Sequence, residues 1–146
     1  MVFDDGVTAC LGDNHFIMTT TTGGAARVYE WLELYHQTEW SELEVYFNTV
    51  TDHWATMTIS GPNSRKLIAE LTDYDVSAEN FGYMDWREMT VAGVPARVFR
   101  ISFTGEMSFE INVQANFGLH VWEKLFEAGE KYNLTPYGTE TCLLYT

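Results

Sequence analysis

Alternating apolar and polar positions run along much of the chain and predict several short β-strands, because successive strand side chains point to opposite faces. β-Branched and aromatic residues dominate these runs, and turn-forming residues separate them. Ala92-Gly93-Val94 places a glycine between two of the runs, as a tight hairpin requires. The predicted strands cover residues 16–22, 43–47, 54–59, 86–91, 95–103 and 108–113.

Apolar residues recur every three or four positions elsewhere, and this spacing predicts amphipathic helices. One expected helix follows Gly23-Gly24, a short one spans residues 64–72 after Pro62, and another spans 117–128 and ends near Gly129. Residues 73–82 are polar and irregular, as in a connecting loop. The first helix has an apolar face formed by Ala25, Val28, Trp31, Leu32 and Tyr35.

The order of these elements predicts an α+β fold. Strands joined by short turns must pair antiparallel, which excludes a doubly wound parallel sheet. Without internal repeats, the 146 residues are expected to form a single domain over 1–146. Asp4 lies almost at the first residue and Leu143-Leu144-Tyr145 at the last turn, so we expect a truncated piece of a longer protein.

Composition narrows the class of protein. The formal net charge of -13 opposes nucleic acid and anionic membranes as partners. Hydrophobic residues make up 46% of the chain, enough for a packed core. No apolar run of about 18 residues predicts a membrane span, and the start lacks a signal-peptide pattern. Cys10 and Cys142 have no metal-ligand spacing, so we expect a cytoplasmic protein without a metal site.

Two carboxylate groups are candidates for chemistry. Asp4 and Asp5 are adjacent, so on an extended backbone only one of them can serve a given pocket. Such a carboxylate could accept a proton or hold a cationic amine. Glu110 lies on an alternating strand and could accept two parallel N–H bonds from an aminopyrimidine ring. Taken alone, the aspartates also fit a solvated turn, and Glu110 fits the polar side of a half-exposed strand.

Several segments together resemble the glycine-cleavage T-protein (aminomethyltransferase) folate-binding family. The resemblance covers essentially the whole chain and depends on the combination, since no single segment is specific. The segments, which have the order and spacing of the family, are Asp4-Asp5-Gly6-Val7, Ile59-Ser60-Gly61-Pro62, Val91-Ala92-Gly93-Val94, Arg100 through Ile111, and Pro136-Tyr137-Gly138-Thr139-Glu140-Thr141.

The resemblance implies an aminomethyltransferase-like domain that binds tetrahydrofolate. Asp5 matches the catalytic carboxylate of the family, and Glu110 matches the glutamate that contacts the pterin. Val7, Tyr83 and Met84 fall where the family lines its folate pocket. Met84 stands where the T-protein has an aromatic residue, so the packing there is expected to differ.

Within the family, the chain resembles the branch found in the C-terminal region of alpha subunits of heterotetrameric sarcosine oxidase. This implies that sarcosine is oxidised to an imine at a flavin and that tetrahydrofolate captures the one-carbon unit as 5,10-methylenetetrahydrofolate. Flavin and NAD sites would lie on other segments. The expected partners are folate, the sarcosine-derived imine, the remainder of the alpha subunit and the other subunits of the enzyme. Self-association of the chain is expected as well. The strings that favour this branch are MTTTTG, WLE, TEW, WATMTISGP, TVAGVPARVFRISFTGE and TPYGTET.

Two other functions stay open at this point. One is a glycine-cleavage-type aminomethyltransferase, and the other is a non-catalytic folate-binding or assembly module. The presence of both Asp5 and Glu110 favours a domain that keeps its chemistry.

Overall fold

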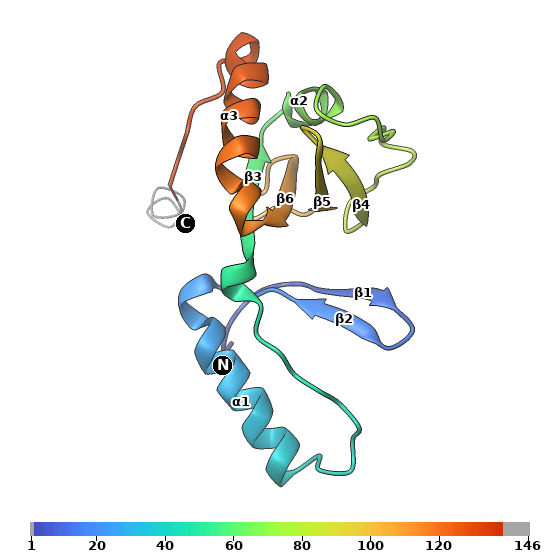
Figure 1. Cartoon of the computed structure of the whole chain (residues 1–146), viewed down its shortest axis with the longest axis vertical. Coiled ribbons are helices and arrows are strands. Elements are labelled where there is room, and N and C mark those ends of the chain that lie inside the picture. The colour runs from blue at the N-terminus through green and yellow to red at the C-terminus, as the bar shows by residue number, and fades with distance from the viewer. Residues whose placement is uncertain (1, 139–146) are drawn as a thin grey trace. The chain divides into compact units, whose positions relative to one another are not determined.

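The computed structural model describes residues 2–138 and divides the chain into two compact units, Met1–Thr51 and Asp52–Thr146 (Figure 1). Each unit combines helices with antiparallel strands, so the predicted α+β class is confirmed. The predicted apolar final turn, Leu143-Leu144-Tyr145, lies outside the described residues.

The first unit consists of a β-hairpin followed by a helix. Strand β1 (Thr8–Gly12) pairs antiparallel with β2 (His15–Met18), and α1 (Ala25–Thr38) follows. The strand predicted over 16–22 is therefore shorter, because the chain turns into a 3₁₀ helix at Thr22–Gly24 before α1 begins. β1 was not among the predicted strands.

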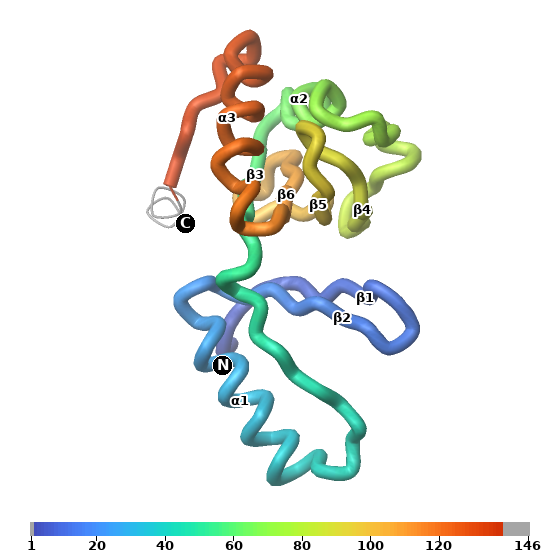
Figure 2. Tube along the Cα trace, in the orientation of Figure 1, coloured from blue at the N-terminus to red at the C-terminus, as the bar shows by residue number. Residues whose placement is uncertain are grey.

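The strand predicted over residues 43–47 is wrong. The backbone N–H groups of Leu43 and Val45 donate to the carbonyls of Trp40 and Leu43, so this segment forms local turns. Tyr46 is 96% exposed, and no strand in the described part of the chain pairs with this segment. A strand is stable only beside another strand, so alternating residues alone were not sufficient. The course of this segment can be followed in Figure 2.

The second unit is built on a four-stranded antiparallel sheet with the order β3-β6-β5-β4. The predicted hairpin around Gly93 is confirmed, although its second strand ends at Phe99 instead of 103. The first strand of the unit, β3, pairs with its last strand, β6. The paired residues run from Trp54 with Gln114 to Ser60 with Ser108. The elements are β3 (Trp54–Ser60), α2 (Ser64–Ala69), β4 (Trp86–Val91), β5 (Val94–Phe99), β6 (Ser108–Gln114) and α3 (Gly118–Gly129).

One face of this sheet forms the core of the unit. Helix α2 packs against β6, and α3 packs against β3 (Figure 1). Burial of each large apolar side chain contributes about 1.5–3 kcal/mol, which makes this layer the main source of stability. The buried set includes Ile59, Leu67, Ile68, Val98, Phe109, Ile111, Val113, Val121 and Leu125.

The close approach of α3 to the sheet depends on a glycine. A Cβ atom at Gly118 would lie 2.6 Å from the Cβ of Ala55 on β3. The helix therefore begins against the sheet without a side chain between them.

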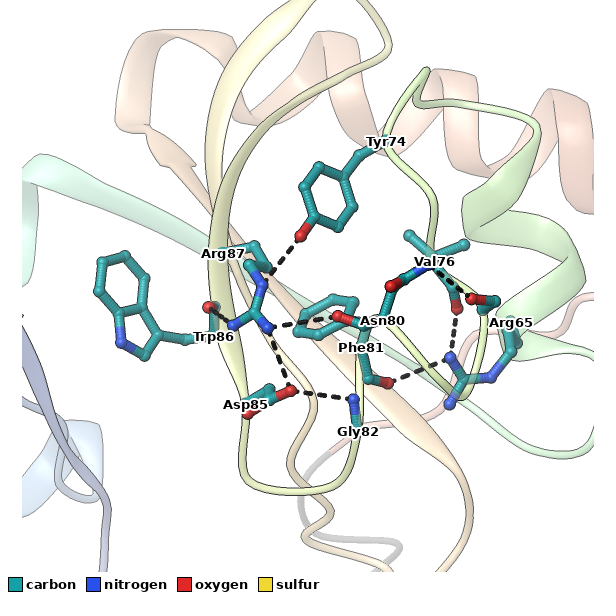
Figure 3. A network of polar contacts seen from close by, with 10 residues as sticks. Arg65, Tyr74, Val76, Asn80, Phe81, Gly82, Asp85, Trp86 and Arg87 are labelled. Atoms are coloured by element: carbon teal, nitrogen blue, oxygen red, sulfur yellow. Dashed lines mark hydrogen bonds and ion pairs between the residues drawn. The ribbon is translucent and has the colours of Figure 1, made fainter.

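Two arginines hold the loop between α2 and β4 in place (Figure 3). Arg65 Nη1 donates to the carbonyls of Val76 and Phe81. Arg87 Nε donates to the Tyr74 hydroxyl at 2.9 Å, and its Nη2 bonds further along the loop. These bonds fix an irregular segment that has no strand or helix of its own.

Candidate functional site

The two N-terminal aspartates differ in what their side chains do. Asp4 Oδ1 accepts the N–H groups of Thr21 at 3.0 Å and of Asp5 at 2.7 Å. The bond from Thr21, followed by that from Asp5, lowers the pKa of the Asp4 carboxyl. Asp5 is exposed, and its Oδ1 accepts only the N–H of the next residue, Gly6, among the described residues. Asp4 is thus committed to the turn, while Asp5 retains acceptor capacity.

Val7 extends the hairpin at its open end. Its carbonyl accepts the N–H of Thr19 at 2.9 Å, and its own N–H donates to the Thr19 hydroxyl at 3.3 Å. The Val7 side chain is half-buried. These bonds hold Asp5 two residues before a fixed strand end.

The face of the second unit's sheet that lies opposite its core carries polar and aromatic side chains. Strand alternation and the cross-strand register place them together, since Glu110 lies between Thr58 and Phe99. We call this surface the open face. Its central members are Trp54, Thr56, Thr58, Trp86, Glu88, Arg97, Phe99, Glu110 and Asn112.

Glu110 is a half-buried carboxylate at the middle of the open face. Burial raises the pKa of its carboxyl above the ordinary value, and a hydrogen bond from Asn112 opposes this effect. Asn112 Nδ2 donates to Oε1 of Glu110 at 3.2 Å. Within residues 2–138, no cationic side chain forms an ion pair with Glu110. An uncompensated carboxylate of this kind is typical of a functional position.

The nearby cation of the open face is already neutralised. Arg97 Nε lies 3.0 Å from Oε1 of Glu88, and its guanidinium lies 5.1 Å from the centre of the Trp54 ring. Trp86 stacks on Phe99 with ring centres 6.3 Å apart. The open face therefore combines a Trp86 ring stacked on the buried Phe99 with a carboxylate, Glu110, that has no ion pair among residues 2–138.

Tyr83 and Met84 lie together in the loop before β4. Both are exposed, at 66% and 59%. Met84 has a φ of 69°, and its N–H donates to the carbonyl of Arg100 at 2.9 Å. The Arg100 guanidinium lies 5.6 Å from the centre of the Tyr83 ring. The loop is thus anchored one residue beyond Phe99, the cross-strand neighbour of Glu110.

The predicted site residues fall into three places. Asp5 and Val7 lie together at the start of the first unit. Tyr83 and Met84 share one loop of the second unit, and Glu110 lies on β6 of the same unit. The N-terminal pair and Glu110 belong to different units.

Residues 2–138 contain no group of three His, Cys, Asp or Glu side chains arranged to hold a metal ion. In the same range, no helix is long and apolar enough to cross a membrane.

Sequence reasoning assigned no role to Asn112 and Thr56, two residues that lie beside Glu110. Asn112 shares the two-residue period of Glu110, which was a usable signal. Thr56 is 56 residues away from Asn112 in sequence, and only the pairing of β3 with β6 brings them together.

Comparison with known proteins gives a consistent family. The profile of the GCVT N-terminal domain matches residues 1–144. The chain is 51% identical over 143 residues to sarcosine oxidase subunit alpha of Corynebacterium sp. (strain U-96), covering 97% of this chain and 15% of that protein. Sarcosine oxidase subunit alpha of Rhizobium meliloti (strain 1021) is 39% identical, with coverages of 96% and 14%.

Aminomethyltransferases are more distant relatives. That of Alkaliphilus metalliredigens (strain QYMF) is 31% identical over 137 residues, or 94% of this chain and 36% of that protein. A chain of the solved heterotetrameric sarcosine oxidase from Corynebacterium sp. U-96, in complex with pyrrole 2-carboxylate, shares the fold with a TM-score of 0.71. That match has 18% identity and covers 91% of this chain and 64% of the other. The present chain therefore spans about 15% of the length of its alpha-subunit relatives.

Proposed function

The chain belongs to the family of the GCVT N-terminal domain, and on that premise we propose that it is the tetrahydrofolate-binding part of a sarcosine oxidase alpha subunit. In this role it captures the one-carbon unit of sarcosine as 5,10-methylenetetrahydrofolate. Its partners are the remainder of the subunit and the other subunits of the enzyme. We place this enzyme in the cytoplasm.

The observation that carries the proposal is the environment of Glu110. Its carboxylate is half-buried, has no cationic partner among residues 2–138, and lies across the sheet from Phe99, which stacks with Trp86. The aminopyrimidine edge of a pterin presents two parallel N–H donors on a flat ring, which is the complement of such a surface. The residues present therefore fit tetrahydrofolate.

Asp5 is the carboxylate that we assign to the reaction itself. It is exposed and free to act because Asp4 takes the structural bonds of the turn. A carboxylate at the reacting nitrogens stabilises positive charge as it develops and can accept a proton. Val7, Tyr83 and Met84 are assigned to folate binding as well, because the family resemblance implies that role for each of them.

When bound, tetrahydrofolate would supply the two nitrogens to which the carbon of the sarcosine-derived imine is transferred, with glycine as the leaving amine. Glu110 binds and orients the pterin, and Asp5 handles charge and a proton at the reacting nitrogens.

The test is the product partition of the complete protein that contains this chain. Sarcosine and tetrahydrofolate are added together, and 5,10-methylenetetrahydrofolate and free formaldehyde are both measured. We expect the folate product to dominate in the wild-type protein and formaldehyde to dominate after Glu110→Gln at subsaturating folate. Equal partition in the two proteins would contradict the proposal.

A glycine-cleavage-type aminomethyltransferase is the second candidate, favoured by the 31% identity to an enzyme of that name. It would form the folate product from an aminomethyl donor and none from sarcosine. A non-catalytic folate-binding or assembly module would bind folate and form neither product. The same assay therefore separates all three functions.

A further inference from the structure

Two consecutive hydrogen bonds on the open face end at Glu110. Thr56 Oγ1 donates to Asn112 Oδ1 at 2.6 Å, and Asn112 Nδ2 donates to Glu110 Oε1 at 3.2 Å. Asn112 is only 8% exposed, so its side chain is packed into this arrangement. Buried amides need such partners, and here both ends of the amide are satisfied.

The sheet register places the three residues of these two hydrogen bonds, Thr56, Asn112 and Glu110, next to one another, and we call them the relay. Thr56 lies directly opposite Asn112 on the neighbouring strand, and Asn112 follows Glu110 by two residues on the same face. Thr58 lies directly opposite Glu110 and makes no side-chain hydrogen bond within the described chain. The open face thus offers two threonines of the same strand, of which one belongs to the relay.

The chemistry of the groups fixes the direction of each bond. An ionised carboxylate only accepts, so Asn112 must present its amino group to Glu110. Its carbonyl oxygen then faces Thr56, whose hydroxyl donates. Both bonds are satisfied only in this one orientation of the amide.

We propose that Asn112, braced by Thr56, is a positioning residue that fixes the Glu110 carboxylate for ligand binding. Asn112 occupies one lone pair of Oε1, and within residues 2–138 Oε2 has no hydrogen-bond partner. Oε2 and the remaining lone pair of Oε1 are therefore available for two parallel donors of a ligand. The inference depends on the proposed function only for the identity of that ligand.

The residues next to Glu110 carry no free charge, so the pKa of its carboxyl should report on the hydrogen bond from Asn112. Its cross-strand neighbours, Thr58 and Phe99, carry no charge, and neither does Ser108 or Asn112 on its own strand. The charged residues of the open face, Arg97 and Glu88, pair with each other. Loss of a donor to the ionised form raises the pKa of a carboxyl.

The experiment is an NMR titration of the 146-residue chain with ¹³C-labelled glutamate carboxyl groups, in which the Glu110 signal is assigned by its loss in Glu110→Gln. We expect Asn112→Leu to raise the midpoint of the Glu110 titration by about one pH unit. Thr56→Val should raise it by less, and Thr56→Ser should restore the wild-type value. Thr58→Val is the matched control and should leave the midpoint in place.

The inference is overturned if Asn112→Leu leaves the midpoint unchanged, or if Thr56→Val and Thr58→Val shift it equally. Because Thr56 and Thr58 are both exposed, their variants test the relay even if Asn112→Leu does not fold. Tetrahydrofolate affinity of the complete protein separates this inference from the proposed function. An unchanged affinity after Glu110→Gln refutes the proposed function, whereas the titration alone decides the role of Asn112.

Discussion

At the residue scale, Glu110 lies in an environment that disfavours the ionised form of its carboxyl group. Burial raises the pKa of its carboxyl, so the folded chain binds a proton there more tightly than the unfolded chain does. The stability that this residue contributes is therefore fully present below the unfolded pKa and is lost as the pH rises through the folded pKa. A position kept at a cost to stability is typical of function.

The upward direction of this pKa shift leads to a prediction for Glu110→Gln. The amide keeps the size and can still accept the bond from Asn112, but it has no charge to bury. We expect the variant to gain free energy of unfolding relative to wild type as the pH rises from about 4 to 7. Urea denaturation at several pH values measures this difference. A variant that is less stable than wild type at pH 7 would show that the ionised carboxylate stabilises the fold.

Replacement of Asp5 should lower the rate of the folate reaction more than the affinity for folate. Asp5→Asn removes the charge that we assign to the reacting nitrogens, so formation of 5,10-methylenetetrahydrofolate by the complete protein should slow by about 10²-fold or more. Folate affinity and sarcosine oxidation should change little. Single-turnover kinetics with sarcosine and tetrahydrofolate give the rate.

Asp4→Asn is the matched control, because its amide oxygen can still accept the N–H groups of Thr21 and Asp5. It should keep the wild-type rate. The assignment of Asp5 would be refuted if the two variants slowed the reaction to the same extent.

At the scale of elements, the hairpin of the first unit exposes apolar side chains. Phe16 and Met18 lie on one face of β2 and are 60% and 52% exposed. Exposed strand edges and apolar patches are normally covered by a partner. We expect the 146-residue chain to self-associate, against the repulsion of its net charge of -13.

Sedimentation equilibrium over a range of concentrations tests this prediction. Phe16→Ser together with Met18→Ser should reduce the average mass toward that of a monomer, while Thr8→Ser on the partner strand should not. A wild-type chain that stays monomeric at millimolar concentration would contradict it.

The helices and strands also show which parts of the fold local sequence patterns can predict. Local signals predicted the hairpin at Gly93, the strand of Glu110 and the helix that ends at Gly129. Residues 43–47 have the same alternation but no neighbouring strand among the described residues, so their pattern was misleading. The relay from Thr56 to Glu110 could not be predicted, because it needs the long-range pairing of β3 with β6.

At the scale of the whole molecule, a folate site needs more surface than one strand face supplies. A small ligand is usually buried over about 70–90% of its surface. The chain spans about 15% of the length of the alpha subunits it resembles. We therefore expect the 146-residue chain to bind tetrahydrofolate weakly or not at all. Calorimetry on this chain checks the expectation, and a micromolar dissociation constant would show that it holds a complete site.

The central claim is that Glu110 binds tetrahydrofolate, and the most direct measurement is the affinity of the complete protein before and after Glu110→Gln. A charged hydrogen-bond partner contributes about 1.5–3 kcal/mol, so calorimetry should show affinity weakened by roughly 10- to 100-fold. Glu127→Gln on α3, whose carboxylate pairs with Lys124 outside the open face, serves as the control and should leave the affinity close to wild type. Wild-type affinity in Glu110→Gln would contradict the account.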